Sequence, residues 1–241
     1  MKRSWIDYMT NLVFPRNIHC LLCGRQILPD EKYSICCLCR EKMTFLFEEN
    51  CCKRCGRPIS YKGEEGFCLE CAGQDLSFDK AVSCLFYDDF SRKLIFQLKY
   101  GKKEYSAFHM AEMLRDRLED SKAGLFDCIV PVPLHVKRER ERGFNQALLL
   151  SEALGKMRGE PVLKEILFRE RQTADQTNLG KKERFKNLRG SFATRGEDEI
   201  KGKRILLVDD VVTTGATSND CTRALMDSGA GSVFVATVAC R

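Results

Sequence analysis

From about residue 76 onward, short apolar runs alternate with stretches in which apolar residues recur every three or four positions. Four strand-like segments are rich in apolar residues: 81–87, 127–133, 204–208 and 232–239. Four further segments have helical spacing: 90–100, 107–118, 144–157 and 217–227. Apolar strands that alternate with helices are typical of a parallel sheet with both faces covered. The pattern therefore predicts an α/β domain, a parallel sheet flanked by helices, over residues 76–241.

Residues 18–75 lack this pattern and are dominated by cysteine. Eight of the cysteines form Cys-x-x-Cys pairs: Cys20/Cys23, Cys36/Cys39, Cys52/Cys55 and Cys68/Cys71. The last two pairs repeat the first two at an offset of 32 residues, and Cys-Gly-Arg-Gln-Ile from residue 23 is echoed by Cys-Gly-Arg-Pro-Ile from residue 55. This is an internal duplication. Each half is typical of a zinc ribbon, in which four thiolates surround one metal ion.

The duplicated cysteines predict two Zn²⁺ ions, one in each half. A reducing cytosol disfavours disulfides, so clustered thiols indicate metal; a disulfide-stapled module or a redox pair is the alternative interpretation. Cys37 and Cys51 fall outside the 32-residue register and are expected to be free thiols, with a role as alternate ligands left open. The later cysteines lie in apolar stretches and are expected to behave as small buried hydrophobes: Cys84, Cys128, Cys221 and Cys240.

Composition and charge narrow the class of protein. Of the 241 residues, 44% are hydrophobic and 31% are charged, which excludes disordered, collagen-like and coiled-coil proteins. No apolar run approaches the roughly 18 residues of a membrane span, and Asp7 and Asn11 interrupt the start where a signal peptide would stay apolar. We therefore expect a soluble, cytoplasmic protein. The net charge of +6 falls to about +2 once two Zn²⁺ held by eight thiolates are included, so any nucleic-acid argument depends on local patches.

Three regions are predicted along the chain. Residues 1–17 form a short helical segment, residues 18–75 a double zinc ribbon, and residues 76–241 the α/β domain. The first segment is amphipathic, and we expect it to pack on its own ribbon, with docking on a partner as the alternative. Its apolar residues are Trp5, Ile6, Met9, Leu12 and Val13.

The segment from Ile205 to Thr217 carries the clearest functional signal. Its apolar start predicts a central strand, and Asp209 and Asp210 follow at the carboxyl end, where ligands bind in open α/β sheets. A loop of small residues then opens a helix, so that free backbone N–H groups and the helix dipole face an anion. The loop consists of Thr213, Thr214, Gly215, Ala216 and Thr217. These residues predict a cradle for a phosphate monoester beside acids that hold sugar hydroxyls or a hydrated Mg²⁺; the alternative is a structural turn with Thr217 as helix N-cap.

This segment resembles the signature of type I phosphoribosyltransferases, which bind 5-phosphoribosyl-1-pyrophosphate (PRPP). The resemblance implies that residues 213–217 hold the 5-phosphate and that Asp209 and Asp210 contact the ribose hydroxyls. It also implies that Mg²⁺ accompanies the pyrophosphate group.

Further motifs make the chain similar to the ComF (ComFC) family from Cys20 almost to its end. They are the Val-Pro-Val-Pro-Leu-His run at 130–135, Arg-Gly-Phe-Asn-Gln at 142–146, Gln-Thr-Asn-Leu at 176–179 and Arg-Phe-Lys-Asn at 184–187. The resemblance implies a double zinc ribbon joined to a phosphoribosyltransferase fold. It also implies a role in handling incoming single-stranded DNA during natural competence, with a helicase of the uptake machinery as a partner.

Whether the chain is an enzyme is left open by the sequence. Phosphoribosyl transfer needs positioning, a Mg²⁺-bound pyrophosphate and exclusion of water more than it needs a nucleophile. The loop after Val132, with Arg138, Arg140 and Arg142 in reach, and a lid at 181–189 are the candidate pyrophosphate donors. In the families that the chain resembles, a hood segment recognises the base. The zinc module is the only candidate for this segment here, and nothing in it indicates a base pocket. An active transferase that moves phosphoribose onto a small nucleobase-like acceptor is therefore the alternative function.

Residues 164–190 supply the sequence argument for nucleic acid. Their local charge is +4, with Phe168 and Phe185 interleaved among the basic residues. Basic groups that follow a backbone and aromatic rings that stack on bases suit single-stranded DNA, whereas two buried phenylalanines are the plainer interpretation. A thiol redox scaffold is the third function hypothesis.

Overall fold

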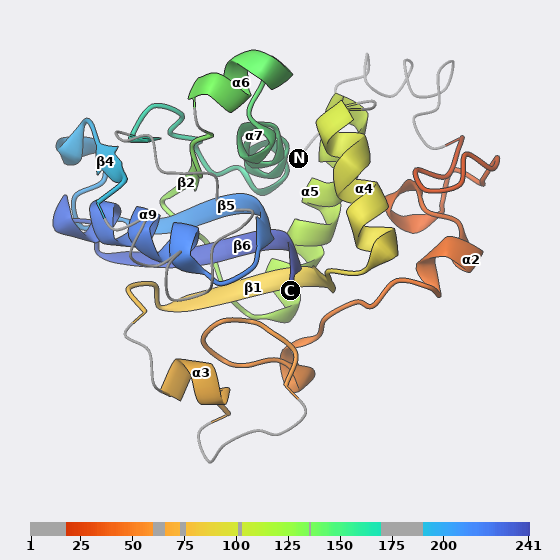
Figure 1. The fold of residues 1–241 in the computed structure, drawn as a ribbon, viewed down its shortest axis with the longest axis horizontal. Helices are drawn as coiled ribbons and strands as arrows, with labels where there is room; N and C mark the ends of the chain where they lie inside the picture. Colours follow the sequence, from red (N-terminus) through yellow and green to blue (C-terminus); the bar gives the residue numbers. More distant parts are fainter. Residues whose placement is uncertain (1–17, 60–65, 73–75, 101–102, 135, 170–189) are drawn as a thin grey trace.

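The computed structural model describes residues 18–59, 66–72, 76–100, 103–134, 136–169 and 190–241 (Figure 1). Its centre is a four-stranded parallel sheet in the order β1-β6-β5-β2. The strands are β1 (Lys80–Phe86), β2 (Cys128–Pro131), β5 (Arg204–Val212) and β6 (Ser232–Cys240). Leu207 of β5 lies opposite Val130 of β2 on one side and Val235 of β6 on the other. The parallel sheet predicted from the apolar runs is confirmed.

Helices cover both faces of this sheet. One face carries α4 (Asp89–Tyr100), α5 (Lys103–Asp120) and α7 (Gln146–Arg158), and the other carries α9 (Ala216–Asp227). Alternate residues of β5 point into the two hydrophobic cores, one on each face of the sheet. Leu206 belongs to the core under α4, α5 and α7, whereas Leu207 belongs to the core under α9, and both are fully buried. Burial on both faces explains why residues 205–208 of β5 form a continuous apolar run.

Short elements complete the α/β domain. A two-stranded antiparallel sheet, β3 (Leu167–Arg169) with β4 (Phe192–Thr194), packs beside α9, and η4 (Glu197–Glu199) precedes β5. The loop expected after Val132 is in fact largely the helix α6 (Val136–Arg142), a correction to the sequence analysis. Its sequence alternates arginine and glutamate, which favour helix without any apolar periodicity to reveal it. Among the described residues, no helix is long and apolar enough to cross a membrane.

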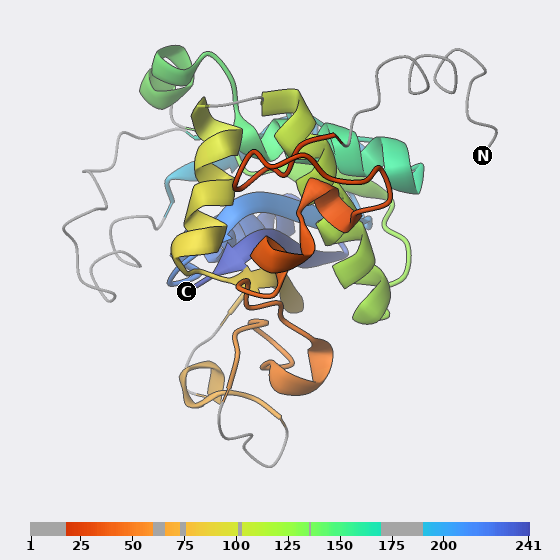
Figure 2. The ribbon, with the colours of Figure 1, turned by 90° about the vertical axis from the view of Figure 1, so that its right-hand side faces the viewer.

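The cysteine region forms two separate modules on the α/β domain. Ribbon 1, residues 18–43, contains η1 (Lys32–Ser34) and α2 (Cys37–Arg40) and lies against α4 and α5. Ribbon 2, the described part of residues 51–72, contains α3 (Leu69–Ala72) and lies below β1 (Figure 2). The connecting segment contains η2 (Glu48–Asn50). Two ribbons that share one sequence pattern thus contact different elements of the α/β domain.

Hydrogen bonds attach ribbon 1 to α5. The hydroxyl of Tyr33 donates to Asp116 Oδ2 at 2.9 Å, and Ser34 shares a short hydrogen bond with Tyr105. Between the ribbons, Arg117 of α5 contacts Glu48 Oε2 at 3.2 Å. These contacts join the cysteine region to the helix that lies directly on the sheet.

Ribbon 2 is attached to the edge strand β1 by its Cys-x-x-Cys turn. The amide of Ala81 in β1 donates to the carbonyl of Arg54 at 2.6 Å, so the turn pairs with the first part of this edge strand. Gly56, at φ +67°, lies so close to β1 that an added Cβ would be 2.4 Å from the carbonyl oxygen of Ala81. The duplicated Gly24 of ribbon 1 has φ +70° and no such neighbour.

This difference predicts that Gly56→Val destabilises the protein far more than Gly24→Val. Both substitutions place a β-branched residue at nearly the same positive φ, so the backbone strain cancels in the comparison. The additional clash at Gly56 must push ribbon 2 away from β1, at about 2 kcal/mol or more. Urea denaturation of the zinc-loaded chains measures the difference. Equal urea midpoints for the two variants would show that the contact between the Gly56 turn and β1 does not limit stability.

Candidate functional site

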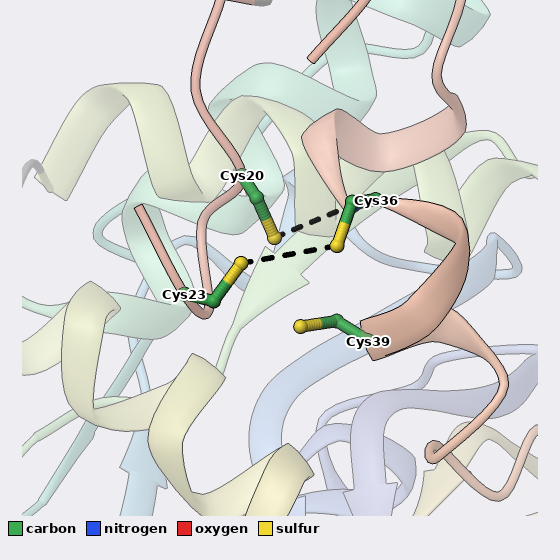
Figure 3. A group of neighbouring side chains, drawn as sticks. All are labelled: Cys20, Cys23, Cys36 and Cys39. Atoms are coloured by element: carbon green, nitrogen blue, oxygen red, sulfur yellow. Dashed lines mark hydrogen bonds between the residues drawn. The ribbon is translucent and has the colours of Figure 1, made fainter. Parts of the chain in front are cut away.

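The structure brings the eight paired cysteines together in two groups of four. Their sulfur atoms lie within 4.8 Å of one another in each group, which consists of Cys20, Cys23, Cys36 and Cys39 or of Cys52, Cys55, Cys68 and Cys71. In the first group two cysteines come from the turn at the start of ribbon 1 and two from the beginning of α2, and their thiols converge (Figure 3). The structure thus brings together the four cysteines of each predicted set.

The sulfur spacing fits tetrahedral zinc. Cys23 Sγ and Cys36 Sγ are 3.8 Å apart, and Cys55 Sγ and Cys68 Sγ are 3.7 Å apart. With Zn–S bonds of about 2.3 Å, two sulfurs of a tetrahedron are separated by about 3.8 Å. Four sulfur ligands and no oxygen donor also match the preference of zinc for thiolate. The two groups are therefore candidate structural zinc centres.

Backbone amides act in the same way on Cys20 and Cys52, which occupy equivalent positions in the two ribbons. The amide of Cys36 donates to Cys20 Sγ at 3.4 Å, and the amide of Cys68 donates to Cys52 Sγ at 3.2 Å. Burial opposes ionisation, but these and neighbouring backbone amides lower the pKa of Cys20 and of Cys52 to about 7. Burial raises the pKa of Cys39 in the first group and of Cys55 in the second. A bound cation would favour the thiolate form of both.

The remaining cysteines lie outside both groups. Cys37 is exposed on α2, and Cys51 is buried against Leu46, Val212 and Cys240. The four later cysteines are all buried, as their apolar surroundings predicted: Cys84, Cys128, Cys221 and Cys240.

The candidate phosphate loop connects β5 to α9. The strand continues to Val212, so Asp209 and Asp210 lie within its last four residues. Gly215, at φ +78°, is the N-cap of α9, which excludes the alternative that Thr217 caps this helix. Thr214 Oγ1 accepts a hydrogen bond from the amide of Ala216 at 3.3 Å.

The loop keeps donors that can face an anion. Among the described residues, the hydroxyls of Thr213 and Thr217 have no hydrogen-bond partner, and the first amides of α9 lack intrahelical acceptors. Such a helix start is suited to a phosphate group.

The two carboxylates interact with each other and with a lysine. Asp209 Oδ1 accepts a hydrogen bond from the amide of Asp210 at 2.8 Å, and Lys99 Nζ lies 2.9 Å from Asp210 Oδ2. Burial, reinforced by the charge of Asp210, raises the pKa of Asp209 well above its ordinary value. The pair is thus held close together in a partly buried position with one cation beside it.

Lys99 is a site residue that the sequence analysis missed. It belongs to α4, more than one hundred residues before the motif, and its side chain crosses to the end of β5. A lysine in the last turn of an amphipathic helix is ordinary. No local sequence signal distinguishes it, because its role depends on how α4 packs on the sheet.

Ribbon 2 borders the phosphate loop. A small hollow is lined by Arg57 and Glu70 of ribbon 2 and by Thr214, Gly215 and Ser218 of the loop and α9. Arg57 and Glu70 are themselves joined by an ion pair of 2.5 Å. The sequence analysis named the zinc module as the candidate hood. Ribbon 2 is the part of that module that lines this hollow.

Asn145, in the Arg-Gly-Phe-Asn-Gln motif at 142–146, has a structural role. Its side-chain oxygen caps α7 by accepting from the amide of Ala147 at 2.9 Å, and its Nδ2 donates to the carbonyl of Val132 at 3.0 Å. It therefore fixes the segment that leaves β2. The motifs at 176–179 and 184–187, the expected lid at 181–189 and the N-terminal segment 1–17 lie outside the described residues.

Only part of the sequence-predicted nucleic-acid segment can be placed. Phe168 lies on β3, and the guanidinium of Arg195 covers its ring at 4.3 Å. Phe185 and most of the basic residues around it fall outside the described residues. The ring of Phe168 therefore already stacks with a side chain of the protein itself.

Comparison with known proteins agrees with this two-part arrangement. A family model described as a double zinc ribbon domain matches residues 9–72, and one described as a phosphoribosyl transferase domain matches residues 151–241. Competence protein F of Haemophilus influenzae is 32% identical over 225 residues, which cover 91% of this chain and 95% of that protein. The chain belongs to the ComF family.

Other members of the ComF family are similar over nearly the same length. DNA utilization protein YhgH of Escherichia coli is 30% identical, covering 90% of this chain and 94% of that protein. Competence protein ComFC of Bacillus subtilis is 28% identical, covering 87% and 89%. This ComF protein thus has the domain composition, double zinc ribbon followed by a phosphoribosyltransferase-type domain, that its sequence predicted.

Solved structures show more distant similarity to this ComF protein. Glutamine phosphoribosylpyrophosphate amidotransferase from B. subtilis is 20% identical with a TM-score of 0.37, and the match covers 54% of this chain and 25% of that one. Orotate phosphoribosyltransferase of Mycobacterium tuberculosis is 14% identical with a TM-score of 0.36, covering 85% and 82%. The family assignment rests on the family models and the sequence relatives.

Proposed function

We propose that this ComF protein binds a PRPP-type ligand with Mg²⁺ and takes part in handling imported single-stranded DNA in the cytoplasm. The observation that supports ligand binding most strongly is the arrangement at the end of β5. Asp209 and Asp210 precede a glycine-capped helix start, and Lys99 is held against the second carboxylate. An acidic pair that is partly buried beside free helix amides suits a phosphorylated sugar better than it suits a purely structural turn.

Each part of the site has a role in this proposal. The amides and hydroxyls of residues 213–217 hold the 5-phosphate, and Asp209 and Asp210 accept hydrogen bonds from the ribose hydroxyls. Mg²⁺, when bound, neutralises the pyrophosphate oxygens. Lys99 holds Asp210 in place as an acceptor through their ion pair.

Replacing Lys99 by methionine is expected to weaken PRPP binding about tenfold, because Asp210 loses a charge-assisted partner. Lys99→Arg should restore most of the affinity, and Lys156→Met on the exposed surface of α7 is the matched control. Calorimetric titrations of PRPP with Mg²⁺ measure the affinities. An affinity in Lys99→Met equal to that of the wild type would remove Lys99 from the site.

The proposed role in DNA handling is supported by family membership. The relatives are named as competence and DNA utilization proteins. Complementation tests the role: the chain is expressed in a naturally competent strain that lacks its own ComF protein, and transformation frequency is measured with duplex DNA. We expect rescue by the wild-type chain and none by Asp209→Asn/Asp210→Asn produced at equal level. Equal failure of both chains, both stable in the cell, would contradict the role.

An active phosphoribosyltransferase is the second candidate function. The hollow between ribbon 2 and the phosphate loop supports it, because Arg57 and Glu70 place polar groups beside the position proposed for the sugar phosphate. The test is pyrophosphate release from PRPP and Mg²⁺ with a panel of nucleobases. Release that depends on one base would establish transfer. Absence of release with every base, in protein shown to bind PRPP, would leave binding without transfer.

A further inference from the structure

The outer face of α4 carries two exposed aromatic side chains. Phe96 is 58% exposed and Tyr100 is 61% exposed, and their ring centroids are 4.6 Å apart with the planes at 43°. The opposite face of α4 is buried in the core through Leu94, Ile95 and Leu98. The aromatic pair therefore does not stabilise the packing of α4, and adjacent exposed aromatic rings are a feature of binding surfaces.

Basic residues precede the aromatic pair on the same face. Arg92 and Lys93 lie one turn before Phe96, and both are exposed. Neither makes an ion pair within the part of the chain that the structure describes, and Lys93 Nζ lies 5.5 Å from the ring centroid of Phe90. We call Arg92, Lys93, Phe96 and Tyr100 the α4 stripe. Within the described residues, no carboxylate forms an ion pair with the two cations of the stripe.

The α4 stripe ends at the candidate phosphoribosyl site. Lys99, the neighbour of Tyr100, contacts Asp210 at 2.9 Å, so the last turn of α4 lies beside the end of β5. The views in Figures 1 and 2 both show α4 running along the flank of the domain, with its last turn on the side of the sheet that carries α6. A ligand on the stripe would thus adjoin the site without passing through the core.

We propose that the α4 stripe binds single-stranded DNA, with bases stacked on Phe96 and Tyr100 and phosphates near Arg92 and Lys93. This proposal rests on the proposed DNA-handling function and names the surface for it. Aromatic faces stack on any base, and cations that follow the backbone supply affinity without sequence preference. The positive charges of Arg92 and Lys93, which have no ion-pair partner among the described residues, favour a polyanion over an apolar protein surface as the occupant. Phe168, whose ring is covered by Arg195, is not open in this way.

Fluorescence anisotropy of a labelled 20-nucleotide oligo-dT with the full-length, zinc-loaded chain tests the proposal. Phe96→Ala/Tyr100→Ala should weaken binding about tenfold or more, because each ring supports a stacked base. Phe47→Ala, at a side chain that is 53% exposed between the ribbons, is the matched control and should bind as the wild type does. Phe96→Tyr/Tyr100→Phe keeps both rings and should retain the affinity. Arg92→Gln/Lys93→Gln should reduce the salt dependence of binding by about 1.4 units of log–log slope, because each phosphate contact contributes about 0.7 on a single strand.

The possible outcomes distinguish failure of the α4 stripe proposal from failure of the proposed DNA-handling function. Oligo-dT binding by the wild type together with unchanged affinity in Phe96→Ala/Tyr100→Ala overturns the α4 stripe and leaves the proposed function standing; a partner protein is then the remaining occupant. A wild type that does not bind oligo-dT overturns both the stripe and direct DNA handling. Circular dichroism melting and PRPP titration of the alanine variant establish that its fold and the neighbouring site are intact. Since both rings are exposed, we expect both measurements to match the wild type.

Discussion

Replacing Cys52 and Cys68 together by serine is expected to lower the zinc content from two equivalents per chain to one and to unfold ribbon 2. The two residues belong to the second group of four sulfurs, and two remaining thiols do not hold zinc tightly. Structural zinc contributes about 10–16 kcal/mol to the folding of small zinc modules. Ribbon 2 has few apolar residues with which to replace that energy. Metal analysis of protein purified under reducing conditions, together with limited proteolysis, measures both effects.

The control for this experiment is Cys37→Ser. Cys37 is an exposed thiol on α2 outside both groups, so the variant should retain two zinc equivalents and resist the protease. Ribbon 1 should remain folded in the Cys52→Ser/Cys68→Ser variant, because it packs on α5 through its own contacts. A wild-type chain free of zinc, with reversible disulfides in its place, would favour the thiol redox scaffold and contradict the metal assignment.

Asp209→Asn/Asp210→Asn is expected to abolish detectable PRPP binding, with a loss of at least about a hundredfold, while the fold is retained. The substitution removes both charged acceptors proposed for the ribose hydroxyls, and each charge-assisted hydrogen bond contributes about 1.5–3 kcal/mol. The side chains are similar in size, so packing is preserved. Asp198→Asn on the exposed η4 is the matched control and should bind PRPP as the wild type does. Titration calorimetry measures the affinities, and native affinity in the double variant would place the ligand elsewhere.

The same variant should change how stability depends on pH. Burial and the charge of Asp210 raise the pKa of Asp209 above its ordinary value of 3.8. The folded state therefore binds a proton that the unfolded state releases, and this contribution to stability is lost as the pH rises from about 4 through the raised pKa. The asparagine variant lacks the contribution, so its unfolding free energy should fall less over that range. Urea titrations at a series of pH values compare the two slopes.

The cysteine repeat and the β5 motif were predictable because their signals are local. Four Cys-x-x-Cys pairs at one offset specify two tetrahedral groups whatever the rest of the chain does, and the structure assembles them. The apolar run before Asp209 specifies a buried strand, and the small residues after it specify the turn into α9. A site whose residues are close together in the sequence can be predicted without knowledge of the fold.

Other features depend on tertiary packing and left no local signal. Lys99 reaches Asp210 only because α4 lies across the end of β5, and Phe96 and Tyr100 read as ordinary helix residues until the buried face of α4 is known. The two ribbons share a sequence pattern, yet only the turn at Gly56 approaches β1. The charged helix α6 has no apolar period by which it could be recognised.

We propose that the β5–α9 loop with Asp209 and Asp210 is a working PRPP site. Calorimetric titration of PRPP with Mg²⁺ into the zinc-loaded wild-type chain tests it most directly. We expect saturable binding of one PRPP per chain that weakens when Mg²⁺ is omitted from the buffer and that competes with ribose 5-phosphate. No heat with PRPP and no competition, in protein that carries two zinc equivalents and melts cooperatively, would contradict it and would leave the loop as inherited architecture.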